Sequence, residues 1–415
     1  MTVEDQPTVA EPTLSGPALS GPQAFNPLAA GPLAEVREGL GSIRESGCPV
    51  HRVAPGLGFV GQHDLVRETL LDHGTFSNQG NFVLEGDDPD DPPPSLITQS
   101  DPPEHAALRS LLRPGFARKV ITDAAPWVRA YTDELIDALP DGGPADLVGD
   151  IALPLTAKVI ARLVGVPAED AAELAQLSLD ITAILPVSFV GTDAWQRLEA
   201  YFTDAARQRR AATDPPDDLV TRLALGRIDG RELGEREVAF HAWQLFVAGL
   251  ESTAYTIGST MWQLLADRGR WERLVADSSL LDNVREEGLR HGSAIRWVLR
   301  TVTEPTEVRD EALAAQDRVI IGLESANMDA AVFGDDAETF VMERPTARRH
   351  VSFGHGIHLC LGAELSRIEI ATALQALVER LPTLALAPGA QYRDVASPMF
   401  CGPQRVDVVW SASGR

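Results

Sequence analysis

The sequence predicts a mainly helical protein with a minor β component. Apolar side chains recur at the three- and four-residue spacing of an amphipathic helix in residues 124–140, 154–167 and 193–212. Strand-like runs are few and short, and they fall at residues 58–61, 317–327 and 405–410. Residues 235–267 contain no proline and are apolar nearly all round. We therefore expect a helix about 50 Å long that runs through the core.

The N-terminal stretch and the length of the chain bear on its domain organisation. Residues 1–25 are rich in proline, serine and glycine and contain no lysine or arginine, which predicts a disordered leader. With 415 residues, the chain exceeds the size at which a single hydrophobic core usually stops growing. The length alone leaves the number of domains open between one and two.

Composition excludes several classes of function. Sixty acidic residues against 36 basic ones give a net charge of −24, which argues against a nucleic-acid partner. No apolar run approaches the ~18 to 20 residues of a membrane span, and the N-terminus lacks the features of a signal peptide. We expect a cytoplasmic protein without a membrane anchor. Three cysteines in such a chain form no disulfide framework, so a special cysteine would carry chemistry or bind a metal.

Two stretches break the regular pattern. Residues 82–94, "FVLEGDDPDDPPP", predict a long irregular loop, and loops of this length in compact domains are commonly functional. The middle of the long apolar helix contains "AGLEST", residues 248–253. Gly249 weakens a helix, and a buried Glu251 is costly unless its carboxylate is satisfied. A simpler alternative is that the hydroxyls of Ser252 and Thr253 only bond back to the previous turn, but this concentration of unfavourable choices favours a functional turn.

The stretch "SFGHGIHLCLG", residues 352–362, surrounds Cys360 with three glycines and two histidines. A thiolate binds zinc, an iron–sulfur cluster or haem iron. Zinc and clusters need several ligands, and His355 and His358 lie closer to Cys360 than the paired spacings of structural zinc sites. Haem needs a single protein thiolate, and glycines let the backbone approach a flat macrocycle. An amphipathic helix follows Gly362, and its N-terminal dipole would stabilise the thiolate.

These residues resemble the haem-binding loop of the cytochrome P450 family, Phe-Gly-x-Gly-x-His-x-Cys-x-Gly, at every fixed position. Further signatures of the family follow in the expected order: "DPPEHAALR" from residue 101, "AGLEST" from 248, "EEGLR" from 286, "SANMDAAVF" from 325 and "FVMERP" from 340. The resemblance covers about residues 26–412 and points to the bacterial branch without a membrane anchor. It implies a single cytochrome P450 domain over residues 26–415, with a long central helix over a buried haem.

The resemblance also implies roles for individual residues. Cys360 would be the proximal thiolate that holds the iron of haem b and favours cleavage of the O–O bond. Phe353, Gly354 and Gly362 would belong to the cofactor-binding loop. The partners of the haem propionates would be His105, Arg109, Arg300 and His358. A buried structural ion network would consist of Glu287, Arg290 and Arg344.

Glu251 and Ser252 match the acid–alcohol pair that relays protons to iron-bound oxygen in this family. The family usually has threonine where Ser252 stands. Serine keeps the hydroxyl but loses the methyl group that restricts its rotation, so proton delivery should survive with looser coupling to substrate oxidation. Ala294 stands where many relatives have a proline, which would alter the strand that lines the pocket.

The substrate pocket of the family is lined by five segments, and most of their residues here are apolar. An apolar ligand of modest size is therefore expected. The predicted lining residues are Phe82, Val83, Leu96, Ile97, Leu185, Phe189, Trp243, Val247, Ala248, Ile295, Val298, Met399 and Phe400.

The loop before His105 also resembles that of bacterial members that oxidise para-substituted benzoates. Pro92 and Trp243 stand at the positions of the two arginines that those enzymes carry. Losing both cations removes the charge complement for an acid. The sequence therefore favours a neutral aromatic substrate, such as a methoxyphenol undergoing O-demethylation, with hydroxylation of a terpenoid, steroid or antibiotic scaffold as the alternative.

Electrons must come from another protein, because the chain has neither an iron–sulfur cysteine set nor a flavin fingerprint. The resemblance implies NAD(P)H electrons delivered through a ferredoxin or a flavin reductase, with O2 as co-substrate. A docking patch for such a partner would consist of Arg109, Arg113, Arg118, Lys119, Arg348 and Arg349, although ordinary solvated charges explain these residues equally well. Two other classes stay open, a peroxide-using haem enzyme of the same fold and a non-enzymatic relative that only binds.

Overall fold

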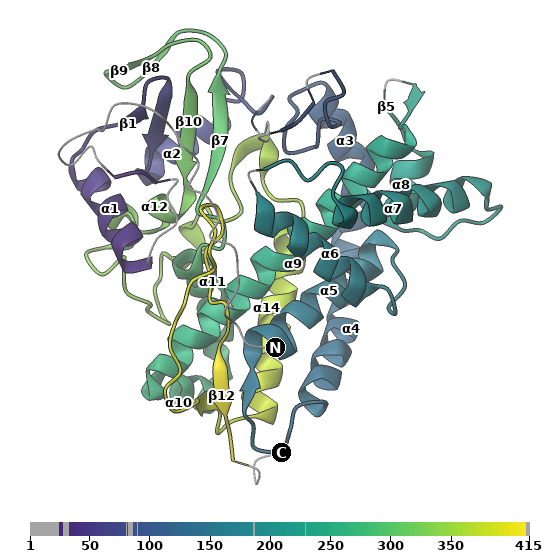
Figure 1. The fold of residues 1–415 in the computed structure, drawn as a ribbon. Coiled ribbons are helices and arrows are strands. Elements are labelled where there is room, and N and C mark those ends of the chain that lie inside the picture. The colour runs from purple at the N-terminus through teal and green to yellow at the C-terminus, as the bar shows by residue number, and fades with distance from the viewer. Residues whose placement is uncertain are drawn as a thin grey trace.

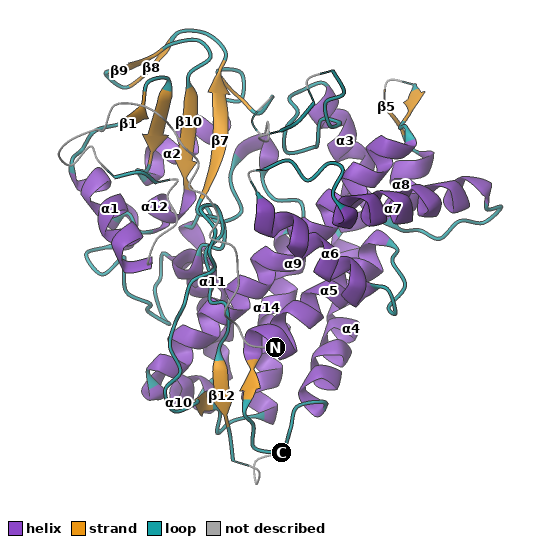
Figure 2. Cartoon of the chain, in the orientation of Figure 1, coloured by secondary structure: helices purple, strands orange, loops and turns teal. Residues whose placement is uncertain are grey.

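The computed structural model of the chain describes residues 25–27, 33–79, 81, 86–88, 90–185, 187–228 and 230–411. Helices make up most of it, and the strands gather mainly in one small sheet (Figures 1 and 2). The predicted mainly helical fold with a minor β component is therefore confirmed. Phe82 and Val83, like all of the predicted leader except Phe25, lie outside the described residues.

The helices follow one another through the whole described chain. Their bounds are α1 Leu33–Glu45, α2 His63–Leu71, α3 Glu104–Leu112, α4 Arg118–Asp137, α5 Leu153–Val164, α6 Ala171–Ile184, α7 Asp193–Ala211, α8 Leu219–Leu225, α9 Glu235–Ala266, α10 Arg268–Ala276, α11 Leu281–Gly292, α12 Leu323–Asn327, α13 Ala330–Phe333 and α14 Ala363–Arg380. Among the described residues, no helix has both the length and the apolar character needed to cross a membrane.

The main sheet lies to one side of the central helix α9, beside α1, α2 and α12, and has the strand order β1-β2-β10-β7-β3 (Figure 2). Its strands are β1 His51–Ala54, β2 Leu57–Val60, β3 Phe76–Ser77, β7 Trp297–Val302 and β10 Arg318–Gly322. β10 pairs with β2 in parallel and with β7 antiparallel. Smaller sheets join β4 Ala145–Asp146, β11 Ala385–Leu386 and β12 Asp407–Val409, then β5 Arg227–Ile228 with β6 Arg231–Glu232, and β8 Thr306–Val308 with β9 Glu311–Leu313.

Helix α9 is the long central helix that the sequence predicts, and it crosses the middle of the molecule (Figure 1). Its first part, up to Leu250, packs in a hydrophobic cluster with α5, α6, α7 and α8. Its second part, from Ala254, packs in another cluster with α4, α11 and α14. The turn "AGLEST" therefore lies at the junction of the two cores.

One predicted strand region is only half a strand. Residues 317–327 were expected to be extended throughout, but β10 ends at Gly322 and α12 begins at Leu323. Glycine suits this corner because a Cβ at Gly322 would stand 2.4 Å from the Phe59 ring. The buried Asn327 side chain at the end of α12 bonds to Ser293, Ser352 and the Val351 N–H, and these tertiary contacts favour the helical turn.

Candidate active site

The loop that carries Cys360 closes on itself before α14 begins. The Cys360 N–H donates to the Phe353 carbonyl at 2.9 Å. Gly354 and Gly356 both have left-handed backbone conformations, with φ of 70° and 72°. A Cβ at Gly356 would also stand 2.5 Å from the Leu70 carbonyl oxygen, so glycine lets the loop lie against the end of α2. Gly362, with φ of −87°, simply precedes the first turn of α14.

The thiol of Cys360 is the exposed member of the three free cysteines, whereas Cys401 is buried. Enough protein surrounds it that desolvation raises the pKa of the Cys360 thiol. The Gly362 N–H and the Arg109 guanidinium oppose this effect and lower the pKa. Among the described residues, no group of three or more His, Cys, Asp or Glu side chains is arranged to hold a metal ion. Cys360 thus offers a single thiolate, which suits haem rather than zinc.

Cation-forming side chains gather beside this loop. The rings of His105 and His358 lie 4.1 Å apart, and the Nε2 atoms of both are buried without a hydrogen-bond partner. Arg300, which is 5% exposed, donates to its neighbouring Leu299 carbonyl. Desolvation lowers the pKa of Arg300 to about 10, and desolvation with the nearby His105 and Arg300 lowers that of His358 to about 3.

Arg109 extends the cluster of His105, His358 and Arg300 by donating to the Leu359 carbonyl at 2.7 Å. None of these four side chains forms an ion pair with another described residue. Arg300 is a buried cation, and a buried charge is unfavourable unless an anion compensates it. The sequence places these residues in two motifs and one strand, and the fold brings them together.

Along the turn "AGLEST", one strip of the α9 surface is accessible rather than packed against other helices. Ala248 is exposed and Val247 and Ser252 are half-buried, although Phe246 and Leu250 beside them are fully buried. Gly249 has a packing reason, because a Cβ there would stand 2.8 Å from the Ile160 side chain of α5. The Ser252 hydroxyl donates to the Ala248 carbonyl at 3.0 Å, as the simpler interpretation of the sequence expects.

Thr253 behaves differently, because its hydroxyl bonds to Ser366 of α14 at 3.0 Å rather than to its own helix.

Glu251 is 4% exposed, and its Oε1 accepts a hydrogen bond from the Tyr255 hydroxyl at 3.0 Å. Burial raises the pKa of the Glu251 carboxyl. Tyr255 was not singled out from the sequence, although its position four residues after Glu251 on a helix was a usable signal.

Glu287 and Arg290 form a fully buried ion pair on α11, with Nε and Oε2 2.7 Å apart. Arg344 joins them through Glu287 Oε1 at 3.1 Å. Carbonyl groups of Asn327, Ala337 and Thr339 accept the remaining N–H groups of Arg290. Every charge is therefore paired and hydrogen-bonded, which a buried ion network requires.

The predicted pocket residues divide into two groups. Some face open space in part, with side chains that are half-buried or, for Ala248, exposed: Ile97, Leu185, Val247, Ala248, Ile295, Val298, Met399 and Phe400. Others are packed in the core, each at most 8% exposed: Leu96, Phe189 and Trp243. Trp243 and Phe189 lie 4.7 Å apart in an aromatic cluster with Trp195 and Phe240.

An unexpected clamp holds the C-terminal turn against the start of β7. The backbone of Arg296 donates to Met399 O at 2.8 Å, and its side chain donates to Phe400 O at 3.1 Å. The same buried guanidinium pairs with Asp394 and, at 2.7 Å, with Glu324. The sequence analysis missed this clamp because its residues lie far apart in the chain and match none of the motifs considered.

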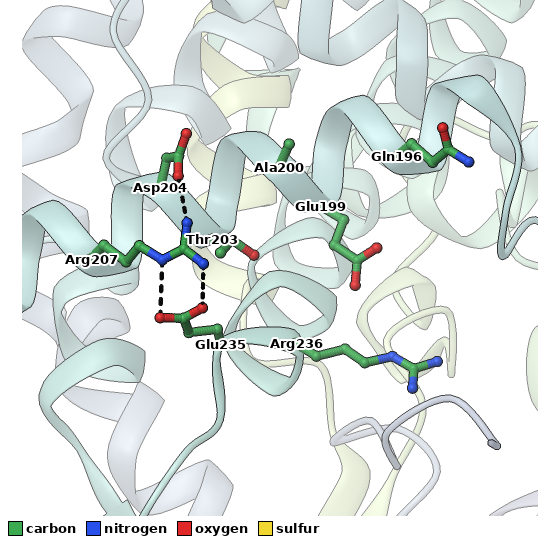
Figure 3. Close-up of a pocket in the computed structure, with 8 residues that line it drawn as sticks. All are labelled: Gln196, Glu199, Ala200, Thr203, Asp204, Arg207, Glu235 and Arg236. Carbon is green, nitrogen blue, oxygen red and sulfur yellow. Dashed lines mark hydrogen bonds and ion pairs between the residues drawn. The ribbon is translucent and has the colours of Figure 1, made fainter.

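A separate groove of about 530 Å³ lies between α7 and the start of α9 (Figure 3). It is lined mainly by polar side chains, and the ion pair of Arg207 with Glu235, 2.7 Å long, crosses it. Arg236 at its edge pairs with Asp91 of the proline-rich loop. None of the predicted site residues lines this groove, and the ion pair of Arg207 with Glu235 links the two helices across it.

Comparison with known proteins identifies the class. The sequence profile of the cytochrome P450 family matches residues 272–395. A steroid C26-monooxygenase of Mycolicibacterium smegmatis is 33% identical over 372 residues, which cover 88% of this chain and 90% of that protein. An erythromycin C-12 hydroxylase of Saccharopolyspora erythraea is 33% identical over 356 residues, covering 84% of this chain and 87% of that one.

Solved structures agree. P450 EryK, in a mutant form complexed with erythromycin B, is 30% identical and superposes with a TM-score of 0.81 over 91% of this chain and 96% of that one. CYP109E1 from Bacillus megaterium, in complex with testosterone, is 29% identical with a TM-score of 0.78 over 93% of this chain and 99% of that one. The chain belongs to the cytochrome P450 family. It is a monooxygenase of that family, and membership implies a haem-thiolate cofactor.

The residues of this chain fit such a cofactor. Buried imidazole Nε2 atoms at His105 and His358, which lack partners, and the buried Arg300 suit the carboxylates of two propionates. The accessible thiol of Cys360 would hold the haem iron, and the accessible strip of α9 around Ala248 would border the cofactor.

Proposed function

We propose that this monooxygenase hydroxylates a bulky, neutral and largely apolar scaffold of the steroid or macrolide kind. The observation that carries the proposal is the chemistry of the accessible pocket side chains. Ile97, Leu185, Val247, Ile295 and Met399 are all apolar and all partly accessible. Arg296, which bonds to the carbonyls of Met399 and Phe400, is committed to Glu324 and Asp394, so it offers no charge complement to an acidic substrate.

The relatives support the same choice. Their names describe oxidation of steroids, of erythromycin and of vitamin D(3). The sequence analysis favoured a small methoxyphenol and O-demethylation, and these comparisons give that choice no support. They favour its alternative, the terpenoid, steroid or antibiotic scaffold.

The proposed reaction consumes the substrate, O2, two electrons and two protons, and it yields the hydroxylated product and water. Haem, when bound, supplies the chemistry that activates O2 and inserts one oxygen atom into a C–H bond. The chain contributes Cys360 as the thiolate ligand, with His105, Arg109, Arg300 and His358 as partners of the propionates. Phe353 supports the ligand loop by stacking under the Arg367 guanidinium, 4.7 Å from the ring centroid.

Glu251 and Ser252 are proposed to deliver the protons. Glu251 is buried, and burial raises the pKa of its carboxyl, which favours the protonated form that a proton donor needs. The Ser252 hydroxyl donates to Ala248 and keeps its lone pairs free to accept, and it lies on the accessible strip of α9. Acid and alcohol are thus adjacent on the helix at the point where it faces the cofactor site.

A ferredoxin or flavin reductase that draws on NAD(P)H is proposed as the electron donor. Arg113, Arg118, Lys119, Arg348 and Arg349 are exposed. Arg113 and Arg118 stand on either side of Phe116 in the sequence. The Phe116 ring lies 3.8 Å from the position of a Cβ on Gly362, which places this segment beside the ligand loop. A basic patch on a protein of net charge −24 suits an acidic partner. The cytoplasmic location remains a prediction.

Two measurements test the proposal. First, the reduced, CO-treated protein should show the red-shifted Soret band of a haem thiolate, and Cys360→Ala should abolish it while Cys48→Ala keeps it. An ordinary Soret position in the unmodified protein would overturn the assignment of Cys360.

Second, a steroid, a macrolide, a 4-methoxyphenol and a benzoate should be titrated while the spin-state shift of the haem is recorded, and O2-driven turnover should be compared with peroxide-driven turnover. Shifts and O2-dependent hydroxylation with the first two support the proposal. A response confined to the small aromatics would overturn the proposed substrate class, and turnover with peroxide alone would favour the peroxide-using alternative.

A further inference from the structure

Tyr255 occupies a position that the proposed chemistry does not yet explain. It lies on α9 one turn after Glu251, is 8% exposed, and donates its hydroxyl hydrogen to Glu251 Oε1 at 3.0 Å. The other carboxyl oxygen, Oε2, is buried and has no hydrogen-bond partner. No described cation forms an ion pair with Glu251. A phenol is therefore the partner that fixes this acid.

A neutral partner has a different consequence from a cationic one. An ion pair with lysine or arginine would hold the carboxyl ionised, whereas a phenol orients one oxygen and leaves the other able to carry a proton. Burial raises the pKa of the Tyr255 hydroxyl, so the phenol keeps its hydrogen and remains a donor throughout the working range of pH. Glu251 can then change its protonation state while its position stays fixed.

The other groups that face Glu251 agree with this arrangement. Burial raises the pKa of Glu251, and the hydroxyls of Tyr255 and, on α6, Thr182 lower it. The Thr182 hydroxyl donates to the Leu179 carbonyl at 3.0 Å, so Tyr255 is the one that makes a hydrogen bond to the carboxyl in this structure. Asp394 is the charged group that acts on Tyr255 from the C-terminal segment.

The C-terminal turn fixes the Tyr255 ring in turn. Phe400 contacts it edge-on, with ring centroids 6.3 Å apart. A Cβ at Gly402 would stand 2.4 Å from the Tyr255 Cβ, so only glycine lets this turn lie directly on the tyrosine. The Gly402 N–H donates to Asp394 Oδ1 at 2.7 Å, which ties the turn to the Arg296 clamp.

We propose that Tyr255 is a positioning residue for the proton-donating carboxyl of Glu251, held in place by the Phe400–Gly402 turn that also borders the substrate pocket. The proposal rests on the proposed role of Glu251 in proton delivery. The coupling of O2 reduction to hydroxylation then depends on Tyr255 as well as on the acid–alcohol pair.

Tyr255→Phe removes a single hydroxyl and tests the proposal directly. We expect an unchanged reduced-CO spectrum and a lower yield of product per electron consumed. Product yield should depend on pH through the titration of Glu251. The midpoint of that dependence should move upward by about one pH unit, because the carboxylate loses its hydrogen-bond donor. In a Glu251→Gln background, Tyr255→Phe should have no further effect on yield or on the pH profile.

Tyr201→Phe is the matched control, because Tyr201 is a half-buried tyrosine whose hydroxyl also donates to a carboxylate, Asp170 Oδ2, at 2.8 Å. It should change neither yield nor pH profile. If Glu251→Gln shifts the profile but Tyr255→Phe does not, or if Tyr255→Phe acts equally with and without Glu251, the positioning role is wrong. If Glu251→Gln leaves yield and profile unchanged, the proposed role of the acid itself is overturned, and the inference falls with it.

Discussion

At the scale of single residues, Ser252 is the departure from the family motif that bears on the proposed proton delivery. The hydroxyl is present and bonds to Ala248 O, but serine lacks the methyl group that limits the rotation of threonine. The hydroxyl therefore has more orientations in which it fails to accept a proton from its neighbour. The proposed proton delivery would keep its hydroxyl, with looser control of the orientation of that group.

Substitutions at this position should separate the two contributions. Ser252→Ala should lower product yield per O2 consumed by about tenfold or more, since a positioned proton-transfer group contributes at least that much. Ser252→Thr should raise the yield above that of the unmodified protein by restricting the hydroxyl. Product and peroxide quantified against O2 uptake measure both effects. Equal yields for the alanine and threonine variants would contradict a role for the hydroxyl.

At the scale of elements, the close approach of α9 to its neighbours determines where the site forms. Gly249 allows α5 to lie against α9, and Gly288 does the same for α11, because a Cβ at Gly288 would stand 2.1 Å from the Thr260 hydroxyl oxygen. The ion pair of Glu287 with Arg290 lies directly beside this contact on α11. The glycine thus sets the distance between the helix of the structural ion network and the helix of the acid.

Gly288→Ala should therefore destabilise the protein by about 1 to 3 kcal/mol, the usual cost of overpacking a core. Gly41→Ala on α1 is the control, since the nearest atom to its added Cβ is 3.6 Å away. It should be neutral or stabilise by up to about 1 kcal/mol through helix propensity. Urea unfolding measures both, and similar losses for the two variants would contradict the packing argument.

At the scale of the whole molecule, buried histidines make the fold sensitive to acid. His241 on α9 is 2% exposed, and desolvation lowers its pKa to about 4. The pKa values of His291 and His350 are lowered by burial as well. In the unfolded chain, each histidine takes up a proton near pH 6.5. The unfolded state therefore binds more protons as the pH falls, and stability that is fully present above about pH 6.5 is lost progressively below it.

For His241 alone, the loss between about pH 6.5 and pH 4 amounts to about 3 kcal/mol. Thermal unfolding followed across this range should show a steady fall in Tm. His241→Gln should make the fall shallower, because glutamine does not titrate. A flat Tm from pH 7 to pH 4, or the same slope in the variant, would contradict the assignment.

The sequence predicted much of the fold because its signals are local. The period of apolar residues identified α9 and α7 almost to the residue, and the loop at Cys360 revealed the family. The region 317–327 was harder, since the change from strand to helix at Gly322 depends on the Phe59 ring and on the partners of Asn327, which come from elsewhere in the chain. A window of eleven residues contains none of that information.

The sequence by itself determined the family and the chemistry that membership implies, because its signals are contiguous: a thiol in a glycine-rich loop, and an acid beside an alcohol on one helix. The tertiary structure decided which residues from distant parts of the chain lie next to one another around the site. His105 meets His358, Tyr255 meets Phe400, and Arg296 meets Asp394 only once the helices and the sheet have packed. The substrate is therefore harder to predict than the reaction, since the pocket is assembled from side chains whose separation depends on the packing of the whole molecule.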